Sequence, residues 1–292
     1  MAQFKLEAIS LRYVNVRDND RYVTLLTADQ GLIDVYARRA RRPKSPLMAR
    51  TEPFVSGTWL GYARGETYYL DQVDIRYLFP KLNQDVTTLT SATQLADLMR
   101  EAAGDPALNG DLYQLLHHAL YALERKPADY KRVVAATGIY TLQLLGLAPD
   151  PHVCGVCGEP LDIRSKLRFY HMAGYFVCER HPYAVDPFTQ QAIYESVPAS
   201  VPQTLAFMED KEPRNYLSFT LGSSDEDALW DFSRTQLMFR LERDWKNLKL
   251  LDELQSQHAD MDELLSRIRT ARETKPQDPD PPEAEPSASA DP

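Results

Sequence analysis

The residues whose spacing predicts chemistry most clearly are three cysteines and a histidine in the middle of the chain. Cys154 and Cys157 form a CxxC pair, and after twenty intervening residues Cys178 and His181 form a CxxH pair. Each pair can hold a metal ion from one tight turn, and four such ligands form a tetrahedron suited to Zn²⁺. Because protein fills all four positions, we expect one structural zinc per chain and no metal catalysis.

Alternatives to this ligand set stay open at the level of sequence. The cysteines can pack without a metal as small apolar side chains. His152 or His171 can replace His181, since a histidine is as often a surface residue. Residues 166–171 and 174–177 look like the two strands of a hairpin that carries the second pair back to the first, which predicts a zinc ribbon or knuckle.

A second segment, residues 38–50, offers charge. It has six cations and no acid, whereas the whole chain has a formal net charge of -9. Guanidinium groups match phosphate oxygens, and neutralised phosphates release counterions, so such a segment favours sequence-independent binding of nucleic acid. The expected DNA-contacting residues are Arg38, Arg39, Arg41, Arg42, Lys44 and Arg50.

Two other interpretations apply to this segment and its neighbours. The cations can form a solvated loop or a docking surface for an acidic protein. Aromatic residues close in sequence can stack on unpaired bases, although for any single one a place in the core is favoured. These aromatic residues are Tyr36, Phe54, Trp59 and Tyr69.

Catalytic motifs are missing from the sequence. We find no phosphate-binding loop, no GxGxxG, no HExxH and no GxSxG. His117 and His118 lie in an amphipathic segment and favour a structural role. We therefore do not expect an enzyme.

Charge and composition limit the remaining function classes. Residues 1–80 carry twelve Lys and Arg against nine Asp and Glu, a balance of +3, which leaves -12 for the rest of the chain. Any contact with nucleic acid must therefore be local. Apolar runs are too short to cross a membrane, and no secretory signal is evident, so we expect a cytoplasmic protein.

The elements that must position these groups fall into two kinds. Short stretches rich in β-branched and aromatic residues at 4–13, 22–27, 32–37, 54–62 and 67–75 predict five strands, and five strands in under eighty residues favour an OB-type barrel. Pro43 and Pro46 then place the basic segment in an irregular loop after the third strand.

From about residue 85 the apolar period becomes helical. We expect helices over 90–103, around Leu112–Leu123 and around Val133–Leu145, and one long helix over 225–256. The predicted fold is α+β, with an OB-fold DNA-binding domain (1–80) and a helical domain (81–260) that holds the zinc insertion at about 150–185. An acidic, proline-rich tail (261–292) is expected to be disordered.

Several segments, taken in their order, resemble the RecO family of bacterial recombination mediators. They are LeuLeuThrAlaAspGlnGlyLeuIle (25–33), AlaArgArgAlaArgArgProLysSer (37–45), ThrGluProPhe (51–54), LeuLeuGlyLeuAlaPro (144–149) and GlyTyrPheValCys (174–178). The resemblance covers residues 5 to 255. It implies an N-terminal OB domain, a helical domain with an embedded zinc site, and binding and annealing of single- and double-stranded DNA.

The resemblance also implies partners and site residues. Such proteins cooperate with RecR and help RecA load onto gaps coated by single-stranded DNA-binding protein (SSB), usually through the C-terminal tail of SSB. The six cations of residues 38–50 match the family's basic DNA-binding segment, and the three cysteines match its metal ligands. His181 departs from the family, because its zinc-bearing members have a fourth cysteine there.

The function expected from these features is a nucleoid-associated DNA repair mediator. The alternative is a protein-protein adaptor that uses the basic loop for an acidic partner without binding DNA. A zinc-dependent nuclease is a third and more distant reading.

Overall fold

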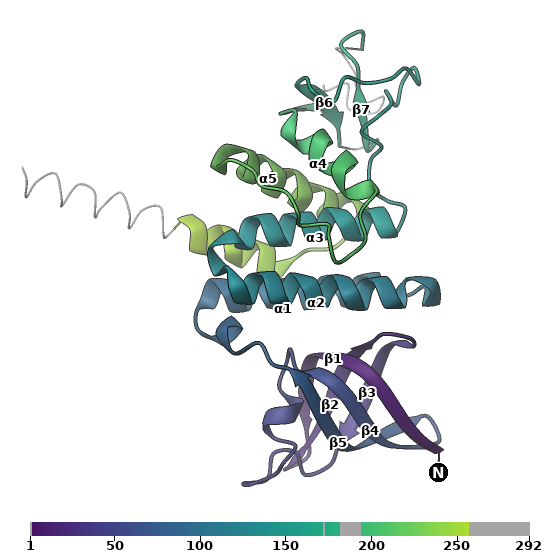
Figure 1. Cartoon of the computed structure of the whole chain (residues 1–292), viewed down its shortest axis with the longest axis vertical. Coiled ribbons are helices and arrows are strands. Elements are labelled where there is room, and N and C mark those ends of the chain that lie inside the picture. The colour runs from purple at the N-terminus through teal and green to yellow at the C-terminus, as the bar shows by residue number, and fades with distance from the viewer. Residues whose placement is uncertain (1, 172, 182–193, 257–292) are drawn as a thin grey trace, which may run out of the picture. The chain divides into compact units, whose positions relative to one another are not determined.

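The computed structural model describes residues 2–171, 173–181 and 194–256. Five strands form a closed barrel in the order β1-β2-β3-β5-β4 (Figure 1). Neighbouring strands are antiparallel except β3 and β5, which pair in parallel. The strands are β1 (Ala2–Val16), β2 (Asp20–Thr27), β3 (Gly31–Ala37), β4 (Ser56–Arg64) and β5 (Thr67–Tyr77).

Alternation of side chains along each strand builds the barrel interior. Val23 and Leu25 of β2 and Val35 of β3 are fully buried, while Tyr22 and Asp34, which directly precede Val23 and Val35, are exposed. Trp59 of β4 is completely buried and fills the same core. The predicted five-stranded OB-type barrel is confirmed, with strand ends within a few residues of those expected.

Helices follow the barrel and share a second core. They are α1 (Val86–Ala102), α2 (Asn109–Arg125), α3 (Tyr130–Leu144), α4 (Ser200–Glu209) and α5 (Ser223–Arg240), and residues 246–256 are also helical. Short 3-10 turns lie at η1 (Ala49–Thr51), η2 (Pro80–Asn83), η3 (Pro106–Leu108) and η4 (Pro127–Asp129). Asp85 caps α1 by accepting a hydrogen bond from the Thr88 amide at 2.8 Å.

The apolar faces expected for the helices are buried as predicted. On α2, Leu112, Leu116 and Leu123 are all completely buried. Helix α3 is buried over almost its whole circumference, and Gly138 lets it approach Ser233 of α5 closely. Barrel residues Ile9 and Leu26 belong to the same apolar cluster as these helices. The expected α+β fold class is therefore confirmed.

The predicted continuous helix over 225–256 is wrong. Helix α5 ends at Arg240, and Glu242 takes a left-handed backbone conformation (φ 47°). The turn lets Trp245 and the residues after it bury their apolar side chains, and the Asn247 amide donates to Asp97 of α1 at 2.9 Å. Burial against α1 therefore outweighs helix propagation at this point.

A small antiparallel sheet lies in the predicted zinc insertion. Its order is β7-β6-β8, with β6 (Leu167–Tyr170), β7 (Tyr175–Val177) and β8 (Tyr194–Val197). The expected hairpin is present as β6 and β7, and β8 was not foreseen. No helix in the described ranges is long and apolar enough to span a membrane. The domain boundaries at 80 and 260 remain a prediction, and 261–292 lie outside the described residues.

Candidate nucleic-acid interface and metal centre

The basic loop, residues 38–50 between β3 and β4, presents five of its six cations to solvent. Arg38, Arg39, Arg41, Arg42 and Lys44 are exposed. Ala40 and Leu47 are buried among the side chains of the barrel core and anchor the loop between them. Proline at 43 and 46 excludes a strand or helix, so the chain makes successive turns instead, closed by Arg42 N–H to Arg39 O and Ser45 N–H to Arg42 O.

Within the described part of the chain, none of these five cations forms an ion pair. Arg50 differs from them. It is half-buried, and its Nη1 donates to the Val73 carbonyl of β5 at 3.1 Å. The structure thus gathers five of the predicted DNA-contacting residues on one exposed loop and ties the sixth to the barrel wall.

Asp20 at the start of β2 fixes the beginning of the loop. Its carboxylate is buried and accepts hydrogen bonds from the Tyr36 hydroxyl and from the Arg39 amide, the latter at 2.7 Å. These two hydrogen bonds, of which the one from Tyr36 has the larger effect, hold the pKa of Asp20 below its usual value. The hydrogen bond between Tyr36 and Asp20 also raises the pKa of Tyr36. Asp20 is therefore an ionised anchor for Arg39.

Arg21 fixes the far end of the loop. Its guanidinium is buried and donates to the Met48 carbonyl at 3.2 Å, to the Thr51 hydroxyl at 3.0 Å and to the Glu52 carboxylate at 2.9 Å. It also lies over the ring of Tyr13, 3.9 Å from the centroid. Arg21 is thus a buried arginine that fixes the loop and is not one of the cations exposed on it.

The aromatic residues singled out from the sequence divide into two groups. Trp59 and Phe54 are buried and serve the core. Tyr36 and Tyr69 lie on the outer face of the barrel and join Tyr22 and Tyr62, which the sequence did not single out. The sequence signal was strand alternation, because Tyr22 is one residue from the buried Val23 and Tyr62 is three residues from the buried Trp59, which places both on the outward face.

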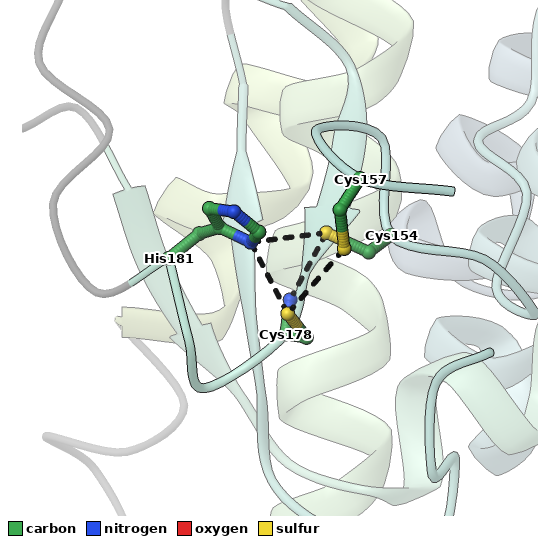
Figure 2. Close-up of side chains that lie close together, drawn as sticks. All are labelled: Cys154, Cys157, Cys178 and His181. Atoms are coloured by element: carbon green, nitrogen blue, oxygen red, sulfur yellow. Dashed lines mark hydrogen bonds between the residues drawn. The ribbon is translucent and has the colours of Figure 1, made fainter. Parts of the chain in front are cut away.

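The four predicted metal ligands meet at one point. Figure 2 shows the side chains of Cys154, Cys157, Cys178 and His181 turned toward one another, and their ligand atoms all lie within 4.8 Å of one another. The two sulfurs of Cys157 and Cys178 are 3.9 Å apart, and His181 Nδ1 is 3.2 Å from Cys178 Sγ. Tetrahedral Zn–S bonds of about 2.3 Å separate two sulfurs by about 3.8 Å, so the cluster fits a metal ion of this size.

Backbone geometry positions the first cysteine pair. Gly158 takes φ 71° and its amide donates to the Cys154 carbonyl at 2.8 Å, which closes the turn. Gly155 lies against Tyr175 of β7, where a side chain would clash. The β6–β7 hairpin delivers Cys178 directly after β7, and the Cys178 amide donates to Cys154 Sγ at 3.4 Å.

The electrostatics of the cluster favour thiolates at Cys154 and Cys178, whereas burial and the contacts with these two sulfurs raise the pKa of Cys157. Burial raises the pKa of Cys154, but amide hydrogen bonds from Cys178, Cys157 and Val156 outweigh it and bring the value to about 6. The contact with Cys178 raises the pKa of His181. Thiolates beside an imidazole are the donor set that a borderline-soft divalent cation prefers.

The two alternative histidines lie elsewhere. His152 Nε2 contacts the Glu209 carboxylate at 2.9 Å, and His171 is enclosed by Glu195 at 2.7 Å and Gln236 at 3.2 Å. Neither is in the cluster of possible ligands. Of the three histidines, only His181 has a ring nitrogen among the sulfurs.

Comparison with known proteins gives a consistent result. The model of the Recombination protein O N-terminal domain matches residues 1–79, and that of its C-terminal domain matches residues 83–195. The chain is 30% identical over 178 residues to the DNA repair protein RecO of an Exiguobacterium species. This match covers 61% of this chain and 70% of that protein. It is 23% identical over 254 residues to RecO of Acetivibrio thermocellus, covering 87% of this chain and 98% of the relative. With RecO of Gloeobacter violaceus it shares 33% identity over 166 residues, 56% of this chain and 62% of the relative.

Proposed function

The chain belongs to the RecO family of DNA repair and recombination proteins, and from this premise we propose that it is a mediator acting directly on DNA. It binds single- and double-stranded DNA through the basic loop, anneals complementary strands and, with RecR, helps load RecA onto single strands coated by SSB. The work is done in the cytoplasm at the nucleoid, and it needs no covalent chemistry.

One observation supports DNA as the ligand more than any other. Five cations project from one loop, and none of their side chains forms an ion pair with another described residue. Asp20 and Arg21 hold the two ends of that loop, so its cations share one surface before any ligand arrives. A preorganised, unpaired cluster of one sign fits a polyanion, because each contacted phosphate releases counterions.

Annealing follows from the same charge. Two complementary strands repel each other through their phosphates, and a cationic loop between them lowers this repulsion. The loop contacts phosphates and leaves the base edges free to pair. Screening and proximity then suffice, and no specific base contact is required.

The metal cluster supports the protein rather than the contact with DNA. Four protein ligands leave no open coordination position, so Zn²⁺ at this cluster would be structural, one per chain. It would join the turn at Cys154 to the end of β7, in a small sheet that also packs on α5 through Phe169 and Phe176 against Phe232. The residues Cys154, Cys157, Cys178 and His181 would hold it.

A pocket beside α4 supports the proposed contact with the C-terminal tail of SSB. Phe207, Phe219 and Leu221 line a hollow of about 350 Å³, and the ammonium of Lys211 lies 4.7 Å from the centre of the Phe207 ring. Its apolar wall suits the apolar end of a peptide and Lys211 suits an acidic residue beside it, while polar residues and Asp225 line the rest of the hollow. RecR would act together with this chain, and RecA would be loaded onto the single strand that they hold.

Charge reversal in the loop tests the proposal. The double variant Arg39→Glu with Arg42→Glu should bind single- and double-stranded oligonucleotides at least tenfold more weakly at low salt, and its salt dependence should be flatter by about two units of slope, because two phosphate contacts are lost. The matched control is Arg125→Glu with Arg214→Glu, two exposed arginines on the helical part with the same change of charge.

The outcome distinguishes DNA binding from an adaptor role. Fluorescence anisotropy of labelled oligonucleotides in a salt series gives both affinity and slope. If the loop variant and the control bind DNA equally, the loop is not the contact. If the unmodified protein binds no oligonucleotide at low salt, the loop serves an acidic protein partner instead.

A further inference from the structure

Four tyrosines form one continuous row across four strands of the barrel. Tyr22 of β2 pairs with Tyr36 of β3, Tyr36 pairs with Tyr69 of β5, and Tyr69 pairs with Tyr62 of β4. Their ring centroids follow at 5.0, 5.6 and 5.1 Å, the last pair stacked with an interplanar angle of 10°. We call these four residues the tyrosine row.

The row lies on the outside of the barrel. Val23, Val35 and Leu70, each next to a tyrosine of the row, point into the core, so the tyrosines point outward by strand alternation. Tyr22 is 39% exposed and the other three are partly exposed. Gly61, which precedes Tyr62 and pairs with Leu70, has no room for a side chain, since a Cβ there would lie 2.0 Å from the Tyr69 carbonyl. This close approach of β4 to β5 brings Tyr62 and Tyr69 into register.

Cations surround the row. The four tyrosines line a hollow of about 380 Å³ together with Val16, Arg17, Arg38 and Arg64. This volume falls within the range of about 300–1,000 Å³ typical of small-ligand pockets. The three arginines are exposed, and none of them forms an ion pair with another described residue. They come from three separate segments, at the end of β1, the end of β3 and the end of β4.

Asp20 links the hollow to the basic loop. It accepts the hydroxyl of Tyr36 in the middle of the row and the amide of Arg39 in the loop. Asp20 attracts Arg17 and Arg38, but the hollow has three arginines and no acidic residue among the described residues that line it, so its charge balance is positive. The aromatic row and the phosphate-binding loop therefore form one continuous surface, in which aromatic faces are next to cations.

Aromatic faces and unpaired guanidinium groups together match one ligand chemistry. A nucleobase has two apolar faces that stack on tyrosine, and its phosphate accepts the forked hydrogen bonds of arginine. A duplex satisfies only the second half of this match, because its bases already stack on their neighbours. Single-stranded DNA satisfies both halves.

Resting on the proposed function, we propose that the tyrosine row and Arg17, Arg38 and Arg64 form a pocket for one unpaired nucleotide of single-stranded DNA. The base packs against the tyrosine rings, and the flanking phosphates lie on the arginines. The basic loop alone binds both forms of DNA, and this pocket adds a preference for the unpaired strand.

An abasic probe tests the pocket without altering the protein. The full chain should bind a labelled oligothymidylate about tenfold or more tightly than an abasic oligonucleotide of the same length, since stacking of one base on an aromatic ring is worth a factor of this size. Affinity for a duplex of the same length measures the contribution of the basic loop alone.

Variants then assign the preference to the row. Tyr22→Leu with Tyr62→Leu should reduce affinity for oligothymidylate to that for the abasic strand and leave duplex affinity unchanged. Tyr22→Phe with Tyr62→Phe keeps the rings and should keep the preference. The matched control is Tyr121→Leu, an equally exposed tyrosine on α2.

The outcomes separate the pocket from the proposed function. Equal binding of the thymidylate and abasic strands by the unmodified protein overturns the pocket, and so does equal loss of single-strand and duplex affinity in the leucine variant. A leucine variant that is less stable to heat but keeps its preference shows that the row only stabilises the sheet. Loss of all DNA binding in the unmodified protein refutes the mediator function itself.

Discussion

The basic loop and the metal cluster place their functional side chains in opposite ways. In the cluster, four ligand atoms turn inward on one another within 4.8 Å. In the loop, five cations turn outward, and their side chains form no ion pair with another described residue. One metal ion would satisfy all four ligands of the cluster, whereas the charges of the loop are neutralised only when an external polyanion binds.

The two regions also differ in which residues occupy left-handed backbone positions. The turns around the metal cluster use glycine where the backbone is left-handed, at Gly158 (φ 71°) and Gly174 (φ 73°). The basic loop has Arg39 (φ 59°) and Lys44 (φ 66°) in the same conformation. A side chain there costs about 1–2 kcal/mol relative to glycine. The loop thus keeps cations at positions where glycine would be more stable, which fits a role for the side chains themselves.

Removal of a ligand from the cluster should have the largest effect. His181→Ala and Cys157→Ser should each lower bound zinc from about one per chain to a small fraction, because three ligands no longer complete the tetrahedron. His152→Ala, which changes the histidine paired with Glu209, should keep its zinc. Elemental analysis of the purified proteins measures this.

The same variants sharpen the contrast between the two regions. His181→Ala should leave affinity for duplex DNA within about twofold, since the loop is anchored by Asp20 and Arg21 in the barrel. A Cys157→Ser protein that still held one zinc would refute the ligand set. A large loss of DNA affinity would show that the two regions are coupled.

Asp20→Asn should weaken the loop anchor by an intermediate amount. We expect a loss of about 2 kcal/mol in the free energy of unfolding at pH 7, because an ionised acceptor of two hydrogen bonds is removed. Urea denaturation followed by circular dichroism gives the value. Asp34→Asn, at an exposed carboxylate of β3, is the control and should cost less than about 0.5 kcal/mol.

The pH dependence of this difference follows from the pKa. The folded protein holds the pKa of Asp20 below its unfolded value, so the stability it contributes is present above the unfolded pKa and is lost as the pH falls through the folded one. The gap between the unmodified protein and Asp20→Asn should therefore narrow below about pH 4. A gap that stays constant down to pH 3 would contradict an ionised anchor.

Lys44→Gly should have the smallest effect, a slight gain in stability together with weaker DNA binding. Relief of about 1–2 kcal/mol of left-handed strain, less about 0.5–1 kcal/mol for the greater entropy of glycine in the unfolded chain, should raise the free energy of unfolding by about 0.5–1 kcal/mol. Loss of one phosphate contact should reduce the salt slope of DNA binding by about one unit. Glu242→Gly, at the left-handed residue after α5, is the control and should gain stability without any change in the slope.

Local patterns in the sequence predicted much of the fold. Alternation along the five strands gave the barrel, and Pro43 and Pro46 gave the loop. The close pairs of Cys154 with Cys157 and Cys178 with His181 predicted the cluster, because each pair is itself a local turn.

Features that depend on distant parts of the chain were missed. The tyrosine row exists only through strand register, since Tyr22 and Tyr62 are brought into one row by pairing across β3 and β5. The break after α5 arises because Trp245 finds a buried site that sequence periodicity does not reveal. The role of Asp20 as an anchor depends on Tyr36 of β3 and Arg39 of the basic loop, sixteen and nineteen residues further along the chain.

The measurement that tests the central claim most directly is the salt dependence of DNA binding by the unmodified protein. With five exposed cations on phosphates, the logarithm of the binding constant should fall linearly with the logarithm of salt concentration, with a slope of about -4.5 for duplex and about -3.5 for single strands. Fluorescence anisotropy between about 50 and 200 mM salt covers the needed range. A slope near zero, or no binding at the lowest salt, would contradict a loop built to contact the DNA backbone.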